Sequence, residues 1–443
     1  MNQDSISFLS QEALPTNGIP LFYDIFNVSS HLSQIEVVAP ANIVNKIFDL
    51  TVELCKSEVQ VSGFNSVPGV YLKEHYKNEI EAAVKSFLLH YFILDFVIEK
   101  IIETKVHMAS YPRLIKMNQD ERGNILFLFD ISLANKIEIK EWKYFPFKPP
   151  RRKNYKDLDK QVDIFLRKEL ECTKKSSTDT VEPGDWICFE ALLVDRDKNV
   201  VFDSFKQDLW IRVDFQSFAD IANKYFIGKK EGDSFIIDYL PISKGFEDNL
   251  FEKHSFLIKI KEVVKGNVFL LSDFKINFKL KNKVEMHEKL VEVFSFRNDI
   301  SQRRAIIEEM FHIFFSKHRF EVPKHLVIRK QEDLLAVLKN KPDYSVYKQN
   351  KDFEDQVERL AERILKEEIL IDQIASSENM EVDSKDIKCY LNLLCNSRLK
   401  EFIYFKPGND LFEEGSIPVK DVSLKQICRR EKTLNFILYT LTK

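Results

Sequence analysis

The side chains that most often carry catalysis or bind metals are scattered in this sequence. His312, His318 and His325 lie six and seven residues apart, and a Phe-Glu-Val-Pro break separates the last two. No acidic residue completes a set of metal ligands on the same helical face, so we interpret these histidines as surface residues. No Ser/His/Asp or Cys/His grouping is recognisable locally. The sequence therefore predicts no metal site and no cofactor.

Glycine and charge content exclude two further classes of function. Only 11 of 443 residues are glycine, and none falls in a G-x-G-x-x-G or G-x-x-x-x-G-K-[ST] arrangement. Nucleotide cradles need such glycines so that the backbone can approach phosphate. The net charge of −3 gives no general attraction to nucleic acid. The run Arg151-Arg152-Lys153 could contact phosphate, although a solvated linker explains it as well, and we expect no DNA partner.

Aromatic residues are the more informative feature. The chain has 37 phenylalanines, and several cluster within Phe311–Phe315 and within Phe402–Phe405. Such clusters usually pack in a core, but they could instead line an apolar groove that holds an extended polypeptide. Composition leaves both interpretations open.

The sequence predicts a cytoplasmic protein without a membrane partner. Its N-terminal segment has an early acid and neither the basic region nor the apolar core of a signal peptide. The most apolar stretch, Phe87–Ile98, is interrupted by His90 and Asp95 and is too short to span a bilayer. The six cysteines form no C-x-x-C pair, which fits reduced structural thiols.

The helices and strands expected from the sequence predict a multi-domain α+β protein. The length suggests about three domains, and the first, at 28–145, is a small α+β N-terminal domain. Its apolar periodicity predicts strands and helices separated by an exposed loop. These segments are a strand over Gln34–Ala39, a helix after Pro40, the loop Val61–Gly69, a helical stretch over Val70–Lys105 and a strand over Ile125–Leu133.

A connector and a β-rich domain follow. The prolines and basic residues of Phe145–Lys153 indicate an extended connector, and we assign 146–179 to a linker and a helix that joins the C-terminal body. Short apolar runs between tight turns predict a β-rich domain at 180–266. These runs are Trp186–Phe189, Val200–Phe202, Phe235–Tyr239 and Phe256–Ile260.

The remainder, 267–443, reads as long helices joined by polar breaks. Pro323 stands where a helix can begin, and Asp383 could cap the helix that follows it. The predicted helices are Ile300–Ser316, Pro323–Leu338, Glu354–Ala375 and Ser384–Leu399.

The order of these domains resembles bacterial trigger factor, the ribosome-associated folding chaperone. The resemblance runs from Gln34 to Leu438 and rests on three sets of motifs. They are V-S-G-F-N-S-V-P-G at Val61–Gly69, where the family has its ribosome-docking signature; V-E-P-G-D-W-I-C-F-E at Val181–Glu190, with Val200–Phe205 and Gly228–Asp233, similar to an FKBP-type prolyl isomerase domain; and F-E-V-P-K-H-L-V at Phe320–Val327, similar to the arm-forming segment of the family's C-terminal domain.

This resemblance implies a chaperone that shields newly made or unfolded polypeptides and assists their folding and export. It also implies docking near the exit tunnel of the ribosome through the loop residues Gly63, Phe64, Asn65, Ser66 and Pro68. Asn65 stands where the family has arginine, Ser66 fills the next place, and the Gly-Lys pair is missing. We therefore expect ribosome binding that is weak or carried by other residues.

The resemblance further implies a peptidyl-prolyl cis-trans isomerase site formed by aromatic residues and one acid. An apolar pocket favours the twisted amide of the transition state over the planar ground state. The expected pocket residues are Phe189, Phe202, Asp203, Trp210 and Phe256. Because Ala219–Phe226 replaces the segment that builds the pocket floor, with Ala222 near the place of a large aromatic, we expect weak or absent activity. The same aromatics would serve equally well as core residues.

For client binding we expect an open cradle of helical arms lined by Phe311, Phe314, Leu334 and Leu338. Two alternatives stay open. One is a plain peptidyl-prolyl isomerase with helical interaction domains. The other is a ribosome-independent scaffold or holdase that has lost both docking and catalysis.

Overall fold

The structure is a computed structural model, and its described residues form two compact units. The first unit holds the described residues up to Leu133 together with Glu190–Gln207 and Ser234–Ile258. The second holds Ala134–Phe189, Asp208–Asp233 and the chain from Lys259 onward. The description covers residues 21–441 except 30, 59–66, 105–107, 135–136, 138, 140, 149–158, 161, 168–179, 203–206, 214–220, 241–253, 266–274, 276–279, 298–299, 340, 396–402 and 407–417.

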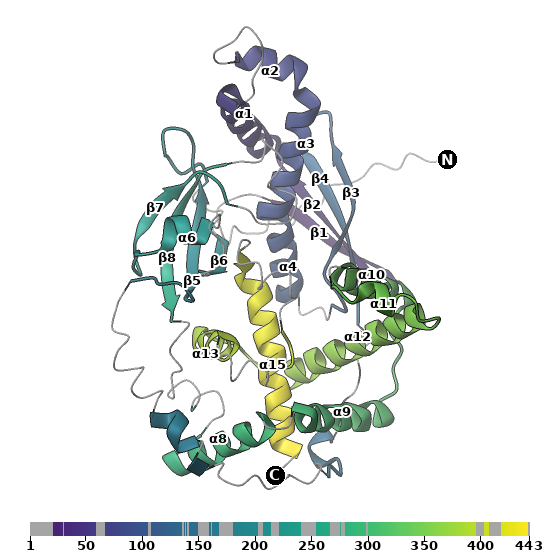
Figure 1. Ribbon diagram of the computed structural model, residues 1–443. Coiled ribbons are helices and arrows are strands. Elements are labelled where there is room, and N and C mark those ends of the chain that lie inside the picture. The colour runs from purple at the N-terminus through teal and green to yellow at the C-terminus, as the bar shows by residue number, and fades with distance from the viewer. Residues whose placement is uncertain are drawn as a thin grey trace. The chain divides into compact units, whose positions relative to one another are not determined.

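A four-stranded antiparallel sheet forms the base of the N-terminal domain (Figure 1). Its strands stand in the order β1 (Phe22–Ser29), β2 (Leu32–Ala39), β4 (Ile125–Ser132) and β3 (Arg113–Gln119). Every second side chain of the two central strands is buried, and Val37 stands beside Phe127 across the ladder. This alternation produces one apolar face, which the helices of the domain cover.

The helical stretch predicted after the exposed loop is confirmed, but it is broken into several elements. After the first helix come α2, α3, a π-helical turn and α4, and Tyr76 leaves the helical region between α2 and α3 with φ −119° and ψ 22°. The strands β1 and β3 were not predicted, because most of their side chains are exposed and show no alternation of polarity. The helices are α1 (Ala41–Glu58), α2 (Gly69–His75), α3 (Lys77–Leu88), η1 (Leu89–Ile93) and α4 (Leu94–Glu103).

The β-rich domain is a five-stranded sheet in the order β7-β8-β5-β6-β9. The prediction of a strand at Val200–Phe202 was wrong, because that segment makes only an isolated bridge between Val194 and Val200. The fifth strand, β9, comes from the C-terminal part of the chain, and no local sequence pattern predicts this pairing. The elements are β5 (Trp186–Leu193), β6 (Gln207–Arg212), α6 (Ile221–Phe226), β7 (Ser234–Ile237), β8 (Phe256–Val264) and β9 (Val419–Lys420).

The helical body agrees closely with the helices predicted from apolar spacing. α10 begins at Lys324, directly after Pro323, and α13 begins after Asp383. Asp383 Oδ1 accepts the Asp386 N–H at 2.9 Å and Asp386 Oδ2 accepts the Asp383 N–H at 3.1 Å, a reciprocal cap. The helices are α8 (Lys283–Arg297), α9 (Ile300–Lys317), α10 (Lys324–Lys339), α11 (Tyr344–Tyr347), α12 (Phe353–Ser377), α13 (Ser384–Cys395) and α15 (Asp421–Leu441).

The residues directly before the predicted connector, and Phe145 at its start, belong to the core of this body. Trp142 opens a short 3-10 turn, η2 (Trp142–Tyr144), and its buried ring packs in a cluster with side chains of α9, α12 and α15. The indole N–H donates to Glu378 Oε1 at 3.2 Å, and the Phe145 ring lies 5.3 Å from that of Phe314. This part of the chain is therefore not a solvated spacer.

Candidate functional site

The loop expected to dock on the ribosome joins α1 to α2 in the sequence. Gly63, Phe64, Asn65 and Ser66 lie outside the described residues. Pro68 is described and stands in extended conformation directly before α2, with φ −61° and ψ 136°. The buried Val67 donates its N–H to the Lys56 carbonyl at 3.2 Å, so the two ends of the loop are held together.

The lysines nearest to this loop are engaged with acids. Lys73 Nζ lies 2.9 Å from an Asp49 carboxylate oxygen, and Lys56 pairs with Glu53. Because each of these two lysines is paired with an acid, each pair has almost no net charge at distances beyond a Debye length. The two lysines therefore add little positive potential around the loop. The described lysines beside the loop thus do not replace the basic residues that the loop sequence lacks.

The aromatic residues expected in the isomerase pocket do not all lie on one face of the β-rich sheet. Phe189 of β5 is fully buried, and its ring lies 5.0 Å from that of Phe226 in α6. Trp186 and Cys188 point to the opposite face, because successive side chains alternate along a strand. Those two share a core cluster with Trp210. The sheet therefore separates Trp210 from Phe189, which corrects the expectation that both line one pocket.

Trp210 instead connects the β-rich sheet to the C-terminal segment. Its indole N–H donates to Asp421 Oδ1 at 2.9 Å, and its backbone pairs with Val419 of β9. The side chain is 2% exposed. A residue so enclosed has a structural role, because it offers no surface to a substrate.

The other expected pocket residues are dispersed. Phe256 of β8 is 3% exposed and stacks on Tyr91 at 5.1 Å between ring centroids. Phe202 is half-buried, and Lys46 Nζ lies 4.8 Å from the centre of its ring. Asp203 lies outside the described residues. Among the described members of the set, only Phe202 is not fully buried.

The four residues expected to line the client cradle differ in their surroundings. Phe311 and Phe314 of α9 are 1% and 0% exposed and belong to the core that also holds Trp142. They face the interior because α12 and α15 cover that side of α9. The expectation that Phe311 and Phe314 line the client cradle is therefore wrong. Leu334 and Leu338 of α10 are half-buried and stay available for contact.

Sequence reasoning missed a set of exposed apolar side chains on the arms of the body. They lie on α10, α11 and α12, and each is at least 44% exposed. Leu360 lies one helical turn after the buried Val357, so helical spacing alone would place it on the buried face. No signal in the sequence marks the others. The set consists of Ile328, Val346, Tyr347 and Leu360.

A buried carboxylate organises the interior of the body. Glu431 of α15 accepts the backbone N–H groups of Tyr404 and Phe405 at 3.0 and 2.9 Å, and an Arg303 guanidinium nitrogen lies 3.6 Å away. Burial raises the pKa of Glu431 above its ordinary value, while Arg303 and the two N–H groups act in the opposite direction. This contact fastens the segment at Tyr404–Phe405 to α15.

Two models of one family match the ends of this chain. The model of the bacterial trigger factor protein matches residues 25–165, and the model of the bacterial trigger factor C-terminus matches residues 284–406. Together they account for more than half of the sequence, in the order that the resemblance requires. The chain belongs to the trigger factor family.

Trigger factors of two bacteria are similar to this chain over most of their length. That of Chlorobaculum tepidum is 22% identical over 382 residues, which cover 83% of this chain and 85% of the relative. That of Rickettsia prowazekii is 23% identical over 373 residues, with coverage of 82% and 80%. A solved structure of the trigger factor chaperone covers 94% of this chain and 99% of its own at 15% identity, with a TM-score of 0.36.

In this trigger factor the matched regions coincide with described architecture. The first model covers most of the four-stranded sheet, α1 to α4 and the turn at Trp142, and the second covers the helices from α8, without its first residue, to α13. None of the helices among the described residues is long and apolar enough to cross a membrane.

Proposed function

We propose that this trigger factor, a chaperone by family, binds unfolded or newly made polypeptides through exposed apolar side chains on the arms of its helical body. The observation that carries the proposal is the set Ile328, Val346, Tyr347 and Leu360, each at least 44% exposed, together with the half-buried Leu334 and Leu338 of α10. Scattered apolar contacts suit a chaperone, because they hold clients of many sequences.

Aggregation of a chemically denatured enzyme, followed by light scattering, tests this proposal. The full chain should suppress scattering at a near-equimolar ratio. A variant with serine at Ile328, Val346 and Leu360 should lose most of the suppression, because it removes three of the four most exposed large apolar side chains of α10, α11 and α12. The control places serine at Val70 and Ile102 of the N-terminal domain, which are similarly exposed. If both variants act alike, the arms are not the client surface.

For the isomerase activity we predict kcat/KM at least about 100-fold below that of an intact FKBP-type domain, because a poorly formed pocket orients proline badly. The burial of Phe189, Trp210 and Phe256 supports this prediction. The measurement is a cis/trans assay on a prolyl peptide with the full chain, since β9 completes the sheet. Full activity that Phe202→Ala abolishes would contradict us and would favour a plain isomerase.

For the ribosome we predict weak, salt-sensitive binding near the exit tunnel. Restoring two cations with Asn65→Arg and Ser66→Lys should tighten binding at least about tenfold at low salt, since charge-assisted contacts to phosphate or acids are strong before screening. Co-sedimentation with purified ribosomes measures it. Tight, salt-resistant binding by the unchanged chain that survives Phe64→Ala would show that this loop is not the docking element.

A further inference from the structure

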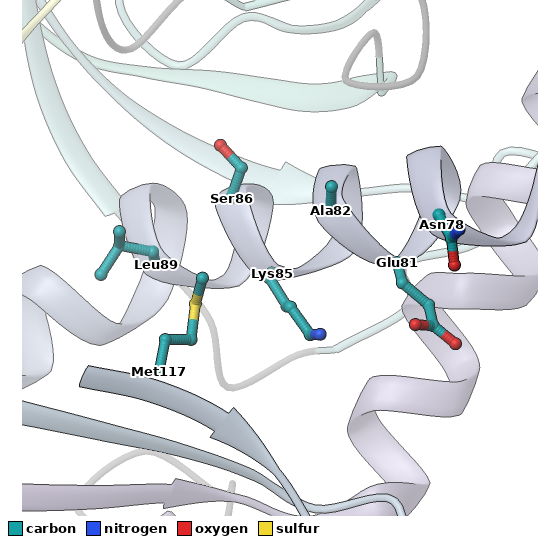
Figure 2. A pocket seen from close by; sticks show the side chains of 7 residues that line it. All are labelled: Asn78, Glu81, Ala82, Lys85, Ser86, Leu89 and Met117. Carbon is teal, nitrogen blue, oxygen red and sulfur yellow. The ribbon is translucent and has the colours of Figure 1, made fainter.

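A groove runs along α3 on the side of the helix that faces β3. Figure 2 shows its larger hollow, a pocket of about 430 Å³ with mostly apolar lining. Met117 extends from β3 toward Leu89, while Lys85 and Glu81 extend from α3 on the same side. A second hollow of about 160 Å³ continues the groove toward Phe48 of α1, and Glu81 and Lys85 line both. The groove is therefore longer than a single side-chain pocket.

The groove accompanies an edge of the N-terminal sheet. β3 is the last strand in the order β1-β2-β4-β3. An added strand would lie about 4.8 Å from β3, and every second side chain of it would point toward α3. A helix beside an edge strand is a recurrent way to bind extended peptides, because main-chain hydrogen bonds supply affinity for any sequence and pockets select alternate side chains.

The charge in the groove favours an acidic residue in the bound segment. Lys85 is half-buried and, within the part of the chain that the structure describes, has no carboxylate within ion-pair distance. Glu81 is 3.7 Å from Lys77 of the same helix. A partly desolvated ammonium without a counter-ion is stabilised by an incoming carboxylate. Apolar side chains beside Leu89 and Met117 and one carboxylate at Lys85 thus define the occupant.

We propose that the groove between α3 and β3 binds an extended, apolar client segment carrying an acidic side chain as an additional strand of the N-terminal sheet. The inference rests on the proposed function in one respect, that the partner is an unfolded polypeptide. It adds a second client site, in the N-terminal domain, with its own mode of binding and its own charge preference.

A short fluorescent peptide tests the site by anisotropy with the full chain. The probe alternates valine with threonine, and glutamate replaces one valine. Lys85→Glu should weaken its binding at least about tenfold, because attraction becomes repulsion. Arg122→Glu is the matched control: the side chain lies in the turn between β3 and β4, is exposed and lines neither hollow, and binding should stay within about twofold. Glutamine in place of the peptide glutamate should weaken binding to the unchanged chain.

The strand-addition mode is tested by methylating alternate backbone nitrogens of the probe, which removes donors without changing side chains. The methylated probe should not bind, and a photoreactive probe should label Arg113–Gln119 or α3. Equal binding of the methylated probe, or indifference to Lys85→Glu, overturns the inference. Labelling of the helical body overturns it as well and leaves the proposed function standing. Tighter binding after removal of residues 1–20 would identify the chain's own N-terminal segment as the occupant and also overturn it.

Discussion

Trp142→Ala should lower the free energy of unfolding of the helical body by about 3–5 kcal/mol, the usual cost of emptying a large buried aromatic site. The ring is 3% exposed, lies 6.2 Å from Phe314 and 5.8 Å from Phe436 between centroids, and donates its N–H to Glu378. The residual space cannot collapse easily, because helices from three parts of the chain surround it. Denaturant unfolding followed by circular dichroism, with hydrogen exchange of α9 and α12, measures the loss.

Tyr144 provides the control for this prediction. It lies two residues further along the same turn and is 85% exposed, so Tyr144→Ala should change stability by no more than about 0.5 kcal/mol. Trp142→Phe should cost an intermediate amount, since it keeps an aromatic ring but loses the hydrogen bond to Glu378. Equal effects of the two alanine substitutions would show that the turn at Trp142 does not belong to the core of the body.

Glu431→Leu should destabilise the body by about 3–5 kcal/mol, because it leaves Arg303 and two backbone N–H groups without their acceptor in a buried place. Glu431→Gln keeps a carbonyl oxygen of the same shape and should stay within about 1 kcal/mol of the unchanged chain. The comparison separates the loss of the acceptor from the loss of the charge. Similar costs for leucine and glutamine would mean that the charge itself, and not the hydrogen bonding, carries the effect.

The same position predicts a pH dependence. Burial makes the pKa of Glu431 higher in the folded than in the unfolded chain, where it titrates near 4.5. A carboxyl with a raised folded pKa makes the folded state less stable as pH rises through that range. The Gln variant should therefore gain stability relative to the unchanged chain as pH rises above about 4.5, and below that pH the difference between the two chains should become independent of pH. Denaturation of both chains across this pH range measures it.

Local signals in the sequence predicted the helical elements well. The fixed φ of Pro323 suits the start of α10, and the Asp383 side chain caps α13. Both helices therefore begin where these residues predict. Apolar periodicity located α9 and α12. These features depend on residues a few positions apart, which is the range over which sequence patterns act.

The sequence could not decide which apolar faces are covered. Phe311 and Leu360 both belong to apolar stripes, but α12 and α15 cover the first, whereas the second is 45% exposed. Trp210 shows the same limit in the β-rich domain. Its position depends on β9 and Asp421, which are more than two hundred residues away in the sequence. The resemblance to an FKBP-type pocket therefore placed Trp210 on the same face of the sheet as Phe189, whereas it lies on the opposite face. Whether an apolar side chain is buried depends on packing partners that are distant in the sequence, and a local sequence pattern carries no information about those partners.

The central claim, that this trigger factor holds unfolded polypeptide through apolar contacts, is tested most directly by equilibrium binding of a permanently unfolded protein. A reduced and alkylated, fluorescently labelled probe is titrated with the full chain, and the same protein in its native form serves as the comparison. We predict micromolar or tighter binding of the unfolded probe that persists at high salt, because apolar contacts are not screened, and no binding of the native form. Failure to bind the unfolded probe, or equal binding of both forms, would contradict the account.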